Sequence, residues 1–381
     1  MSTPNPDVTV RILDASSARF GGPVRLSLSG LVHAQRVADA LPDGGEVDGS
    51  AGTLVVTTSL PALHTAIAAA VDPAQLVPVE LAVERAVGAW LDGPDDLPLG
   101  GGHAPLVTGT RTVIQGILNV TPDSFSDGGT FLADDGDLTP AIEAGLRMVD
   151  EGADIIDVGG ESTRPGADPV REELELARTV PVVRALAERG IVVSIDTTKA
   201  AVARAAVEAG AVIVNDVSAG RMDADLLPTV ADLDVAYVLM HMQGTPRTMQ
   251  QGPTYTDVVA EVFDDLATGI VRLRAAGVDL ERVIVDPGIG FGKTLEHNLV
   301  LLARLRELTS LGRPVLVGAS RKSFIGRLTG TADPADRLEG SLAAATLAVA
   351  GGARIVRVHD VAATVRSVAV ADAVLAAGEN R

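Results

Sequence analysis

Arginine and histidine alternate in a short apolar run near the end of the chain. Arg357 and His359 are two positions apart, so on a β-strand both side chains point to the same side. A guanidinium offers a forked pair of donors to a phosphate, and an imidazole adds a further hydrogen bond. The run Ser320–Ser323 precedes an expected helix, whose free N–H groups and positive end favour an anion. These residues predict a site for an anionic ligand.

Acidic and amide side chains end three other apolar runs, at Asp196, Asn215 and Asp286. Carboxylate and amide groups can match the several donors and acceptors of a buried polar ligand. The alternative is that they only cap the helices that follow, which is a common role of Asp and Asn. Three such residues at separate strand ends favour a shared ligand site.

Short β-rich runs alternate with longer helical patterns from Val113 onward, which is typical of repeated βα units. The expected strands are Val113–Asn119, Asp154–Val158, Val192–Asp196, Val212–Asp216, Ala236–His241, Val283–Asp286, Pro314–Gly318 and Ile355–His359. Amphipathic helices are expected at Arg171–Glu188, Lys199–Ala209 and Leu295–Glu307. Seven of these eight strands end in polar or glycine-rich groups, which favours a (β/α)8 TIM barrel, with its site at the strand carboxyl ends, over a doubly wound open sheet.

The first part of the chain has a different pattern and contains no motif that carries chemistry. Strands are expected at Val8–Leu13 and Gly52–Thr58, and helices at Val32–Leu41 and Leu63–Ala70. The segment Gly93–Pro105 is rich in Gly, Pro and Asp, as linkers often are. We therefore expect a small α/β domain over residues 1–105 and the catalytic barrel over residues 106–381.

Composition excludes several classes of function. The chain has 50 acidic and 31 basic residues, a formal net charge of −19, which disfavours nucleic-acid and anionic-membrane partners. Cysteine is absent, which excludes disulfides and thiolate catalysis and fits a cytoplasmic location. No stretch of about twenty apolar residues predicts a membrane span.

Five longer motifs occur in the barrel region. They are GILNVTPDSFSDGG at Gly116–Gly129, GGESTRPGA at Gly159–Ala167, DPGIGFGK at Asp286–Lys293, GASRKSFIG at Gly318–Gly326 and RVHD at Arg357–Asp360. In type and order they closely resemble the dihydropteroate synthases, over about Val113–Leu375. The resemblance implies condensation of a dihydropterin diphosphate with 4-aminobenzoate, and inhibition by sulfonamides that mimic the latter.

The resemblance also assigns residues to the two substrates. For the pterin it implies Asp196, Asn215, Asp286 and Lys322, with Met240 as an apolar wall. For 4-aminobenzoate it implies Ser323 at the carboxylate, while Phe125, Thr163, Pro165 and Phe291 complete the binding set.

For the diphosphate the resemblance implies Arg357, His359 and Asn119, and Asn119 is also the expected ligand of Mg²⁺. We expect Asp127 to orient the attacking amine or accept its proton. The expected catalytic residues are Asp127, Arg164, Lys322, Arg357 and His359. The family's homodimer is the expected assembly.

Two other functions are compatible with parts of this pattern. A corrinoid-type methyltetrahydrofolate methyltransferase resembles the barrel and shares the Asp, Asn and Asp set, but it does not need Arg357 with His359. A pterin-binding paralogue without catalysis would have little use for both loop motifs, TPDSFSDGG and STRPGA. His241 and Tyr237 belong to matching runs, and we expect His241 to be structural. Arg321 is equally compatible with a solvated surface charge.

Overall fold

The computed structural model describes residues 9–14, 23–29, 34–42, 44–48, 53–71, 73–92, 96–100, 102–121, 137–162 and 169–379. The chain divides into two compact units. Unit 1 contains Met1–Pro94 together with Arg306–Arg313, and unit 2 contains Asp95–Leu305 and Pro314–Arg381.

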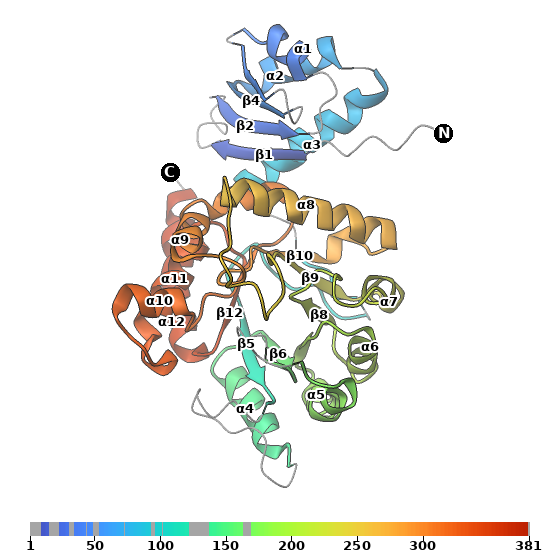
Figure 1. Ribbon diagram of the computed structural model, residues 1–381, viewed down its shortest axis with the longest axis vertical. Coiled ribbons are helices and arrows are strands. Elements are labelled where there is room, and N and C mark those ends of the chain that lie inside the picture. The colour runs from blue at the N-terminus through green and yellow to red at the C-terminus, as the bar shows by residue number, and fades with distance from the viewer. Residues whose placement is uncertain are drawn as a thin grey trace. The chain divides into compact units, whose positions relative to one another are not determined.

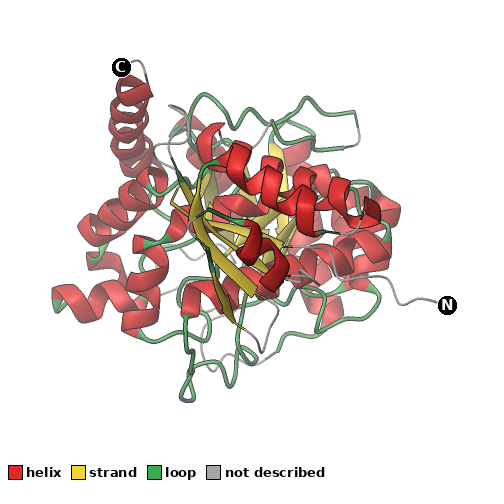
Figure 2. Ribbon diagram, turned by 90° about the horizontal axis from the view of Figure 1, so that it is seen from above, coloured by secondary structure: helices red, strands yellow, loops and turns green. Residues whose placement is uncertain are grey.

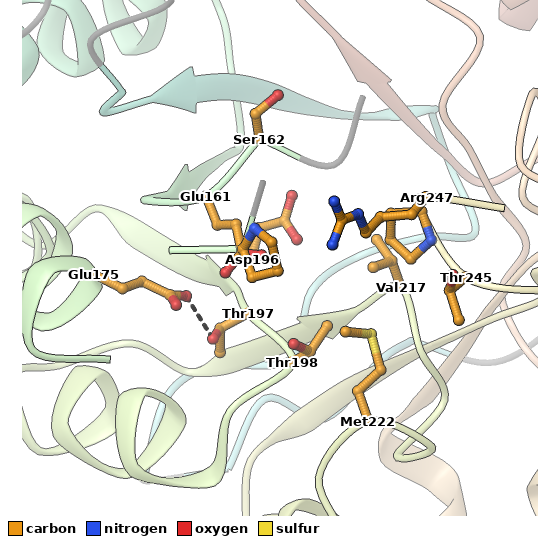
Figure 3. Close-up of a pocket in the computed structure, with 12 residues that line it drawn as sticks. Glu161, Ser162, Glu175, Asp196, Thr197, Thr198, Val217, Met222, Thr245 and Arg247 are labelled. Atoms are coloured by element: carbon orange, nitrogen blue, oxygen red, sulfur yellow. Dashed lines mark hydrogen bonds between the residues drawn. The ribbon is translucent and has the colours of Figure 1, made fainter. Parts of the chain in front are cut away.

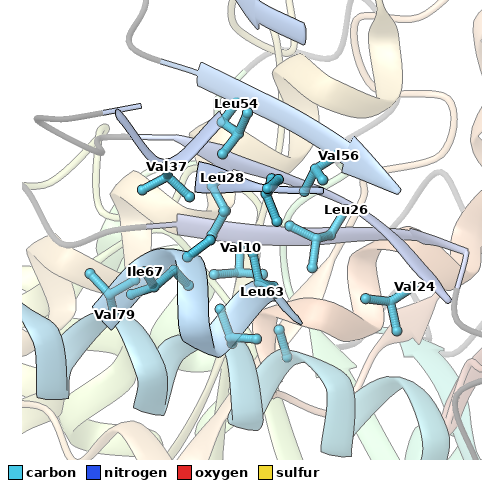
Figure 4. Packing of buried hydrophobic residues seen from close by; sticks show 14 of the residues in the cluster. Val10, Val24, Leu26, Leu28, Val37, Leu54, Val56, Leu63, Ile67 and Val79 are labelled. Carbon is cyan, nitrogen blue, oxygen red and sulfur yellow. The ribbon is translucent and has the colours of Figure 1, made fainter. Parts of the chain in front are cut away.

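Unit 1 is a four-stranded antiparallel sheet with helices packed against it. Its elements are β1 (Thr9–Asp14), β2 (Val24–Ser29), α1 (Ala34–Ala40), β3 (Glu46–Asp48), β4 (Thr53–Thr58), α2 (Leu60–Ala70) and α3 (Pro73–Asp92), with strand order β1-β2-β4-β3. Alternate strand residues such as Leu26, Leu28 and Leu54 meet Leu63 and Ile67 of α2 in one apolar core (Figure 4). The expected small α/β domain is confirmed, with β2, β3 and α3 as elements that the sequence pattern did not reveal.

Unit 2 is a (β/α)8 barrel, as expected (Figures 1 and 2). Its strands are β5 (Val113–Asn119), β6 (Ile155–Gly159), β7 (Val192–Asp196), β8 (Ile213–Asp216), β9 (Ala236–Met240), β10 (Val283–Asp286), β11 (Leu316–Val317) and β12 (Ile355–Val358). They pair in parallel in the order β10-β9-β8-β7-β6-β5-β12-β11. A parallel bridge between Val285 and Val315 joins β10 to the residue before β11 and closes the ring.

Helices follow the strands and surround them in Figure 1. They are α4 (Thr139–Asp150), α5 (Glu172–Ala187), α6 (Ala200–Glu208), α7 (Leu226–Leu233), α8 (Val258–Ala276), α9 (Leu295–Ala303), α10 (Ser323–Thr329), α11 (Leu338–Ala350) and α12 (Val361–Glu379). Short 3-10 turns lie at Leu280–Arg282, Leu305–Leu311 and Pro334–Asp336. The expected helix Leu295–Glu307 ends earlier, at Ala303, and the chain continues as a 3-10 turn.

Apolar side chains fill the end of the barrel where the strands begin. Val113, Ile213 and Ile284 belong to one buried cluster with Leu97 and Leu99. Leu97 and Leu99 come from the segment before β5, where Leu97 pairs with Leu106 in an antiparallel bridge. This segment therefore completes the barrel core, and unit 2 begins at Asp95 rather than at residue 106.

Candidate active site

Four strand-end residues lie side by side at the other end of the barrel. In register, Asn119 of β5 is opposite Gly159 of β6, Gly159 is opposite Asp196 of β7, and Asp196 is opposite Asn215 of β8. Partners on adjacent parallel strands point to the same face. Because Gly159 has no side chain, the space above it is bordered by Asn119 and Asp196: a Cβ there would lie 3.6 Å from Asn119 Oδ1 and 3.7 Å from Asp196 Oδ2.

Arg357 connects β12 to β6 and β7, which are two and three strands away in the sheet order. Its Nε donates to Asp157 Oδ2 at 2.6 Å, and its Nη2 donates to Asp196 Oδ2 at 2.7 Å. Asp157 is completely buried and also accepts from Asn215 Nδ2 at 3.0 Å. Asp157 was not among the expected site residues. It links Arg357 to Asn215, and through Arg357 to Asp196.

Burial and charge change the acidity of this cluster. Burial raises the pKa of Asp196 to about 7, although the Arg357 guanidinium opposes the change. For Arg357, burial alone would lower the pKa, but Asp157 and Asp196 outweigh it and the net change is upward. Arg357 is therefore a permanent cation, and Asp196 is the group whose charge can change near neutral pH.

Lys322 lies beside the segment that follows β10. Its Nζ donates to the Ile289 carbonyl oxygen and lies 4.5 Å from the centre of the Phe291 ring, which permits a cation–π contact. Burial lowers the pKa of Lys322 to about 8, and Asp286 opposes the change. Burial raises the pKa of Asp286, whose Oδ1 accepts from Gly288 N at 2.7 Å. The expected pterin residues Asp286 and Lys322 are thus close and electrostatically coupled.

Met240 belongs to an apolar cluster at the same end of the barrel. It packs with Val217, Met242 and Met249, and Phe291 lies against them. Thioether side chains adapt to flat ring systems and contact them favourably. This cluster supplies an apolar wall beside the polar groups of Asp286 and Lys322.

A cavity of about 240 Å³ opens at the mouth beside Asp196 (Figure 3). It is lined by residues of four βα loops, including Glu161, Thr198, Met222 and Arg247. Of the expected pterin residues, only Asp196 lines it.

A partly buried ionic network forms one wall of this cavity. Lys199 Nζ donates to both Glu161 and Glu175, and Thr197 Oγ1 donates to Glu175 Oε1 at 2.6 Å. Glu175 is fully buried, although it is one of three acidic residues in the first turn of α5. The network fixes the loop after β7, immediately behind Asp196.

The remaining expected residues have distinct surroundings. His359 is held by Ser320, whose Oγ lies 3.0 Å from Nδ1 and 3.2 Å from the His359 amide nitrogen. Ser323 is exposed at the start of α10. Arg321 makes a two-point ion pair with Asp360, at 3.0 and 2.6 Å, so it is a paired structural charge. The expected residues Phe125, Asp127, Thr163, Arg164 and Pro165 lie outside the described residues.

Comparison with known proteins identifies the family. The family model described as "Pterin binding enzyme" matches residues 115–359, which include every site residue named above from Asn119 to His359. A dihydropteroate synthase of Mycobacterium leprae is 52% identical over 271 residues, which are 70% of this chain and 94% of that protein. The chain belongs to the dihydropteroate synthase family.

Solved structures of dihydropteroate synthases superpose on the barrel. One from Xanthomonas albilineans with 4-aminobenzoic acid has a TM-score of 0.67 and 48% identity, covering 74% of this chain and 99% of that chain. One from Burkholderia cenocepacia, complexed with 7,8-dihydropteroate, has a TM-score of 0.66 and 46% identity, covering 75% and 99%. The family members thus match the barrel over nearly their whole length, and leave about a quarter of this chain unmatched.

Proposed function

We propose that this chain is a dihydropteroate synthase, which condenses (7,8-dihydropterin-6-yl)methyl diphosphate with 4-aminobenzoate to give 7,8-dihydropteroate and diphosphate. One observation carries the proposal: Arg357 binds both Asp196 and Asp157, and Asp157 binds Asn215, at the mouth of a barrel that shares about half of its residues with synthases of this name. The relatives' complexes with 4-aminobenzoic acid and 7,8-dihydropteroate support both ends of the reaction.

The pterin site consists of buried hydrogen-bonding groups and an apolar wall. Asp196, Asn215 and Asp286 are each less than a tenth exposed, so ring donors and acceptors that they bind are removed from water. Each of these groups needs a hydrogen-bonding partner on the pterin, because a buried polar atom without a partner destabilises the complex by about 1–3 kcal/mol. Met240 faces the flat ring, and Lys322 lies where the pterin and the second substrate would meet.

The 4-aminobenzoate site lies next to Lys322. Phe291 provides a ring wall, and the exposed hydroxyl of Ser323 donates to the substrate carboxylate. We assign Phe125, Thr163 and Pro165 to the same substrate on the family resemblance. Arg164 is proposed on the same ground as a catalytic residue.

The diphosphate site is formed by Asn119, Arg357 and His359 at the carboxyl ends of their strands. His359 is oriented by Ser320, and Arg357 supplies a permanent positive charge beneath it. Because the guanidinium already binds Asp157 and Asp196, Arg357 supports the pterin residues as well as the leaving group. Replacement of Arg357 would therefore affect both parts of that substrate.

The reaction needs no enzyme nucleophile. The amine nitrogen of 4-aminobenzoate attacks the exocyclic methylene carbon of the pterin, the C–O bond to the diphosphate breaks, and the diphosphate leaves with the bonding electrons. The amine loses one proton, which Asp127 accepts or directs to solvent. The protein contributes position and electrostatic stabilisation, which suffice for large accelerations when reactants are held in contact.

Mg²⁺ is the proposed cofactor, and the oxygen donors at Gly159 fit it. Among the described residues, no three His, Asp or Glu side chains are grouped to hold a metal, and we propose that the substrate diphosphate supplies further oxygen ligands. A Cβ at Gly159 would lie 3.6 Å from Asn119 Oδ1, and hard cations prefer oxygen. Bound Mg²⁺ would neutralise charge on the leaving diphosphate.

Replacement of Asn119 by Ala is therefore expected to raise the Mg²⁺ concentration for half-maximal activity about tenfold. The reason is the loss of one oxygen ligand, while the KM for 4-aminobenzoate stays within about twofold of the wild-type value. Titration of diphosphate release with MgCl2 at saturating substrates measures this. An unchanged Mg²⁺ dependence in a folded Asn119→Ala protein would show that Asn119 is not the metal ligand.

We propose a homodimer in the cytoplasm. Leu347 on α11 and Val370 and Val374 on α12 are each more than 60% exposed, and α11 packs against α12. Large exposed apolar side chains on adjoining helices are typical of subunit contacts. No helix among the described residues is long and apolar enough to cross a membrane. Sedimentation equilibrium of the whole chain would test the assembly.

The N-terminal unit is proposed to be dispensable for chemistry. A chain shortened to start at Asp95 is expected to keep turnover per folded site within about twofold, because every assigned residue lies beyond it. A chain that starts at Leu106 lacks Leu97 and Leu99, which are at most 2% exposed in the barrel core. Its free energy of unfolding should be at least about 4 kcal/mol lower, since each leucine contributes about 2 kcal/mol or more.

Both shortened chains are compared with the full chain by urea unfolding and by diphosphate release. Some loss of stability is expected in each, because Arg306–Arg313 belongs to unit 1, where Ser310 Oγ accepts from Ile12 N at 2.9 Å. A folded but inactive chain starting at Asp95 would show that the first unit contributes to catalysis.

A further inference from the structure

Two buried ionisable side chains near the site have no part in the proposed reaction. His241 follows β9 and is 6% exposed, and Lys293 ends the segment after β10 and is 2% exposed. A lysine side chain is rarely this buried without a specific partner. Lys293 thus joins His241 to Asp286–Lys293, the segment that carries Asp286 and Phe291.

The Lys293 amine joins the two segments by hydrogen bonds. Its Nζ lies 2.8 Å from His241 Nδ1, 3.0 Å from the Phe291 carbonyl oxygen and 3.5 Å from the His241 carbonyl oxygen. An ammonium group has three N–H donors, and a neutral amine has two, which is enough for the two shorter contacts. The link is therefore satisfied in either protonation state.

The protonation of His241 suits this arrangement. Burial, together with the neighbouring Lys293 and Arg221, lowers the pKa of His241 to about 2. The imidazole is thus neutral at physiological pH, and one ring nitrogen is an acceptor. Burial lowers the pKa of Lys293 as well, and the Asp286 carboxylate opposes this change.

The backbones of the segments after β9 and β10 lie very close to each other. A Cβ at Gly288 would lie 2.0 Å from the His241 carbonyl oxygen, and a Cβ at Gly292 would lie 2.5 Å from the Gln243 carbonyl oxygen. Both glycines have positive φ, 65° and 62°. The segment after β10 therefore lies directly on the segment after β9.

The two ends of the segment are held differently. Asp286 is fixed by strand pairing with Met240, by the bond from His241 N to its carbonyl oxygen and by Gly288 N. At Phe291, the amide nitrogen donates to Gly288 O within the segment, and the carbonyl oxygen accepts from Lys293. On either side of Phe291, the carbonyl oxygens of Gly290 and Gly292 accept from Gln250 Nε2 and Tyr255 Oη, so loss of the lysine amine would free the Phe291 carbonyl itself and would remove no hydrogen bond from Asp286.

We infer that Lys293, held by His241, is a positioning residue that fixes the Phe291 ring against 4-aminobenzoate without contacting either substrate. The inference rests on the proposed assignment of Phe291 to that substrate. His241, which the sequence predicted to be only structural, would then act by holding the Lys293 amine in place. The inference also predicts different effects on the KM values of the two substrates, because Asp286 keeps its own hydrogen bonds.

The test compares variants at these two positions by steady-state kinetics. Lys293→Met removes the amine with similar bulk and is expected to raise the KM for 4-aminobenzoate about tenfold. The KM for the pterin diphosphate should change less than about twofold. His241→Leu should act like Lys293→Met, whereas His241→Asn, whose amide oxygen can replace Nδ1 as acceptor, should recover most of the lost affinity.

The outcomes separate this inference from the proposed function. If the wild-type chain releases no diphosphate with 4-aminobenzoate, the function itself fails. If the wild type is active and folded variants, checked by circular dichroism, leave the KM for 4-aminobenzoate unchanged or raise both KM values equally, only the positioning role is wrong. The His241 pair keeps the test decisive if Lys293→Met does not fold.

Discussion

Replacement of Asp157 by Asn is expected to lower kcat/KM for the pterin diphosphate by at least about 100-fold. Asp157 is fully buried, and its Oδ2 accepts from both Arg357 Nε and Asn215 Nδ2, so an amide oxygen could keep both bonds, but the negative charge that pairs with Arg357 would be lost. Removing one partner of a buried ion pair costs about 3–5 kcal/mol, and every 1.4 kcal/mol is a factor of ten. Steady-state kinetics and urea unfolding measure both effects.

Asp154, three residues before Asp157, provides a matched control. It pairs with Arg111, whose side chain is 57% exposed, near the beginning of β6. Exposed ion pairs contribute at most about 1 kcal/mol. Asp154→Asn should therefore leave kcat/KM within about twofold. If Asp157→Asn behaved like this control, Arg357 and Asn215 would not depend on Asp157.

Replacement of Lys322 by Met is expected to lower kcat/KM by about 100-fold and to remove an alkaline limb from the pH profile. Burial lowers the pKa of Lys322 to about 8, so its charge is present at pH 7 and is lost as the pH rises through 8. Hydrogen bonds to charged groups contribute about 1.5–3 kcal/mol, which corresponds to the expected loss. The wild-type kcat/KM should fall about tenfold per pH unit above pH 8.

Lys322→Arg is the control for charge. A guanidinium stays protonated over the whole range, so any activity that remains should not fall between pH 8 and 10. A wild-type profile that stays flat to pH 10, or an unchanged limb in Lys322→Arg, would assign the charge requirement to another group.

Local pattern predicted the barrel well, because each strand is a short apolar run that ends in polar residues. Val113–Asn119, Val192–Asp196 and Val283–Asp286 have the expected bounds. In unit 1 the pattern missed β2 and α3: β2 is a short alternation with two serines, and α3 contains Gly88 and an internal proline at Pro78.

The site was harder to predict because its contacts join distant parts of the chain. Strand-end position was enough to predict Asp196, Asn215 and Asp286. The ion pairs of Arg357 join it to residues 200 and 161 positions away, and no local spacing reveals them. Asp157 did give a signal, since a charged residue inside a strand that is buried on both faces needs a partner. Glu175 gave none, because it is one of several acidic residues in the first turn of α5.

The most direct test of the account is diphosphate release by the purified full chain. With dihydropterin diphosphate and Mg²⁺, we predict release that depends strictly on added 4-aminobenzoate, with one 7,8-dihydropteroate formed for each diphosphate. A methyltransferase or a pterin-binding protein without catalysis would bind pterin but release no diphosphate in this way. Tight pterin binding without 4-aminobenzoate-dependent release would contradict the proposed function.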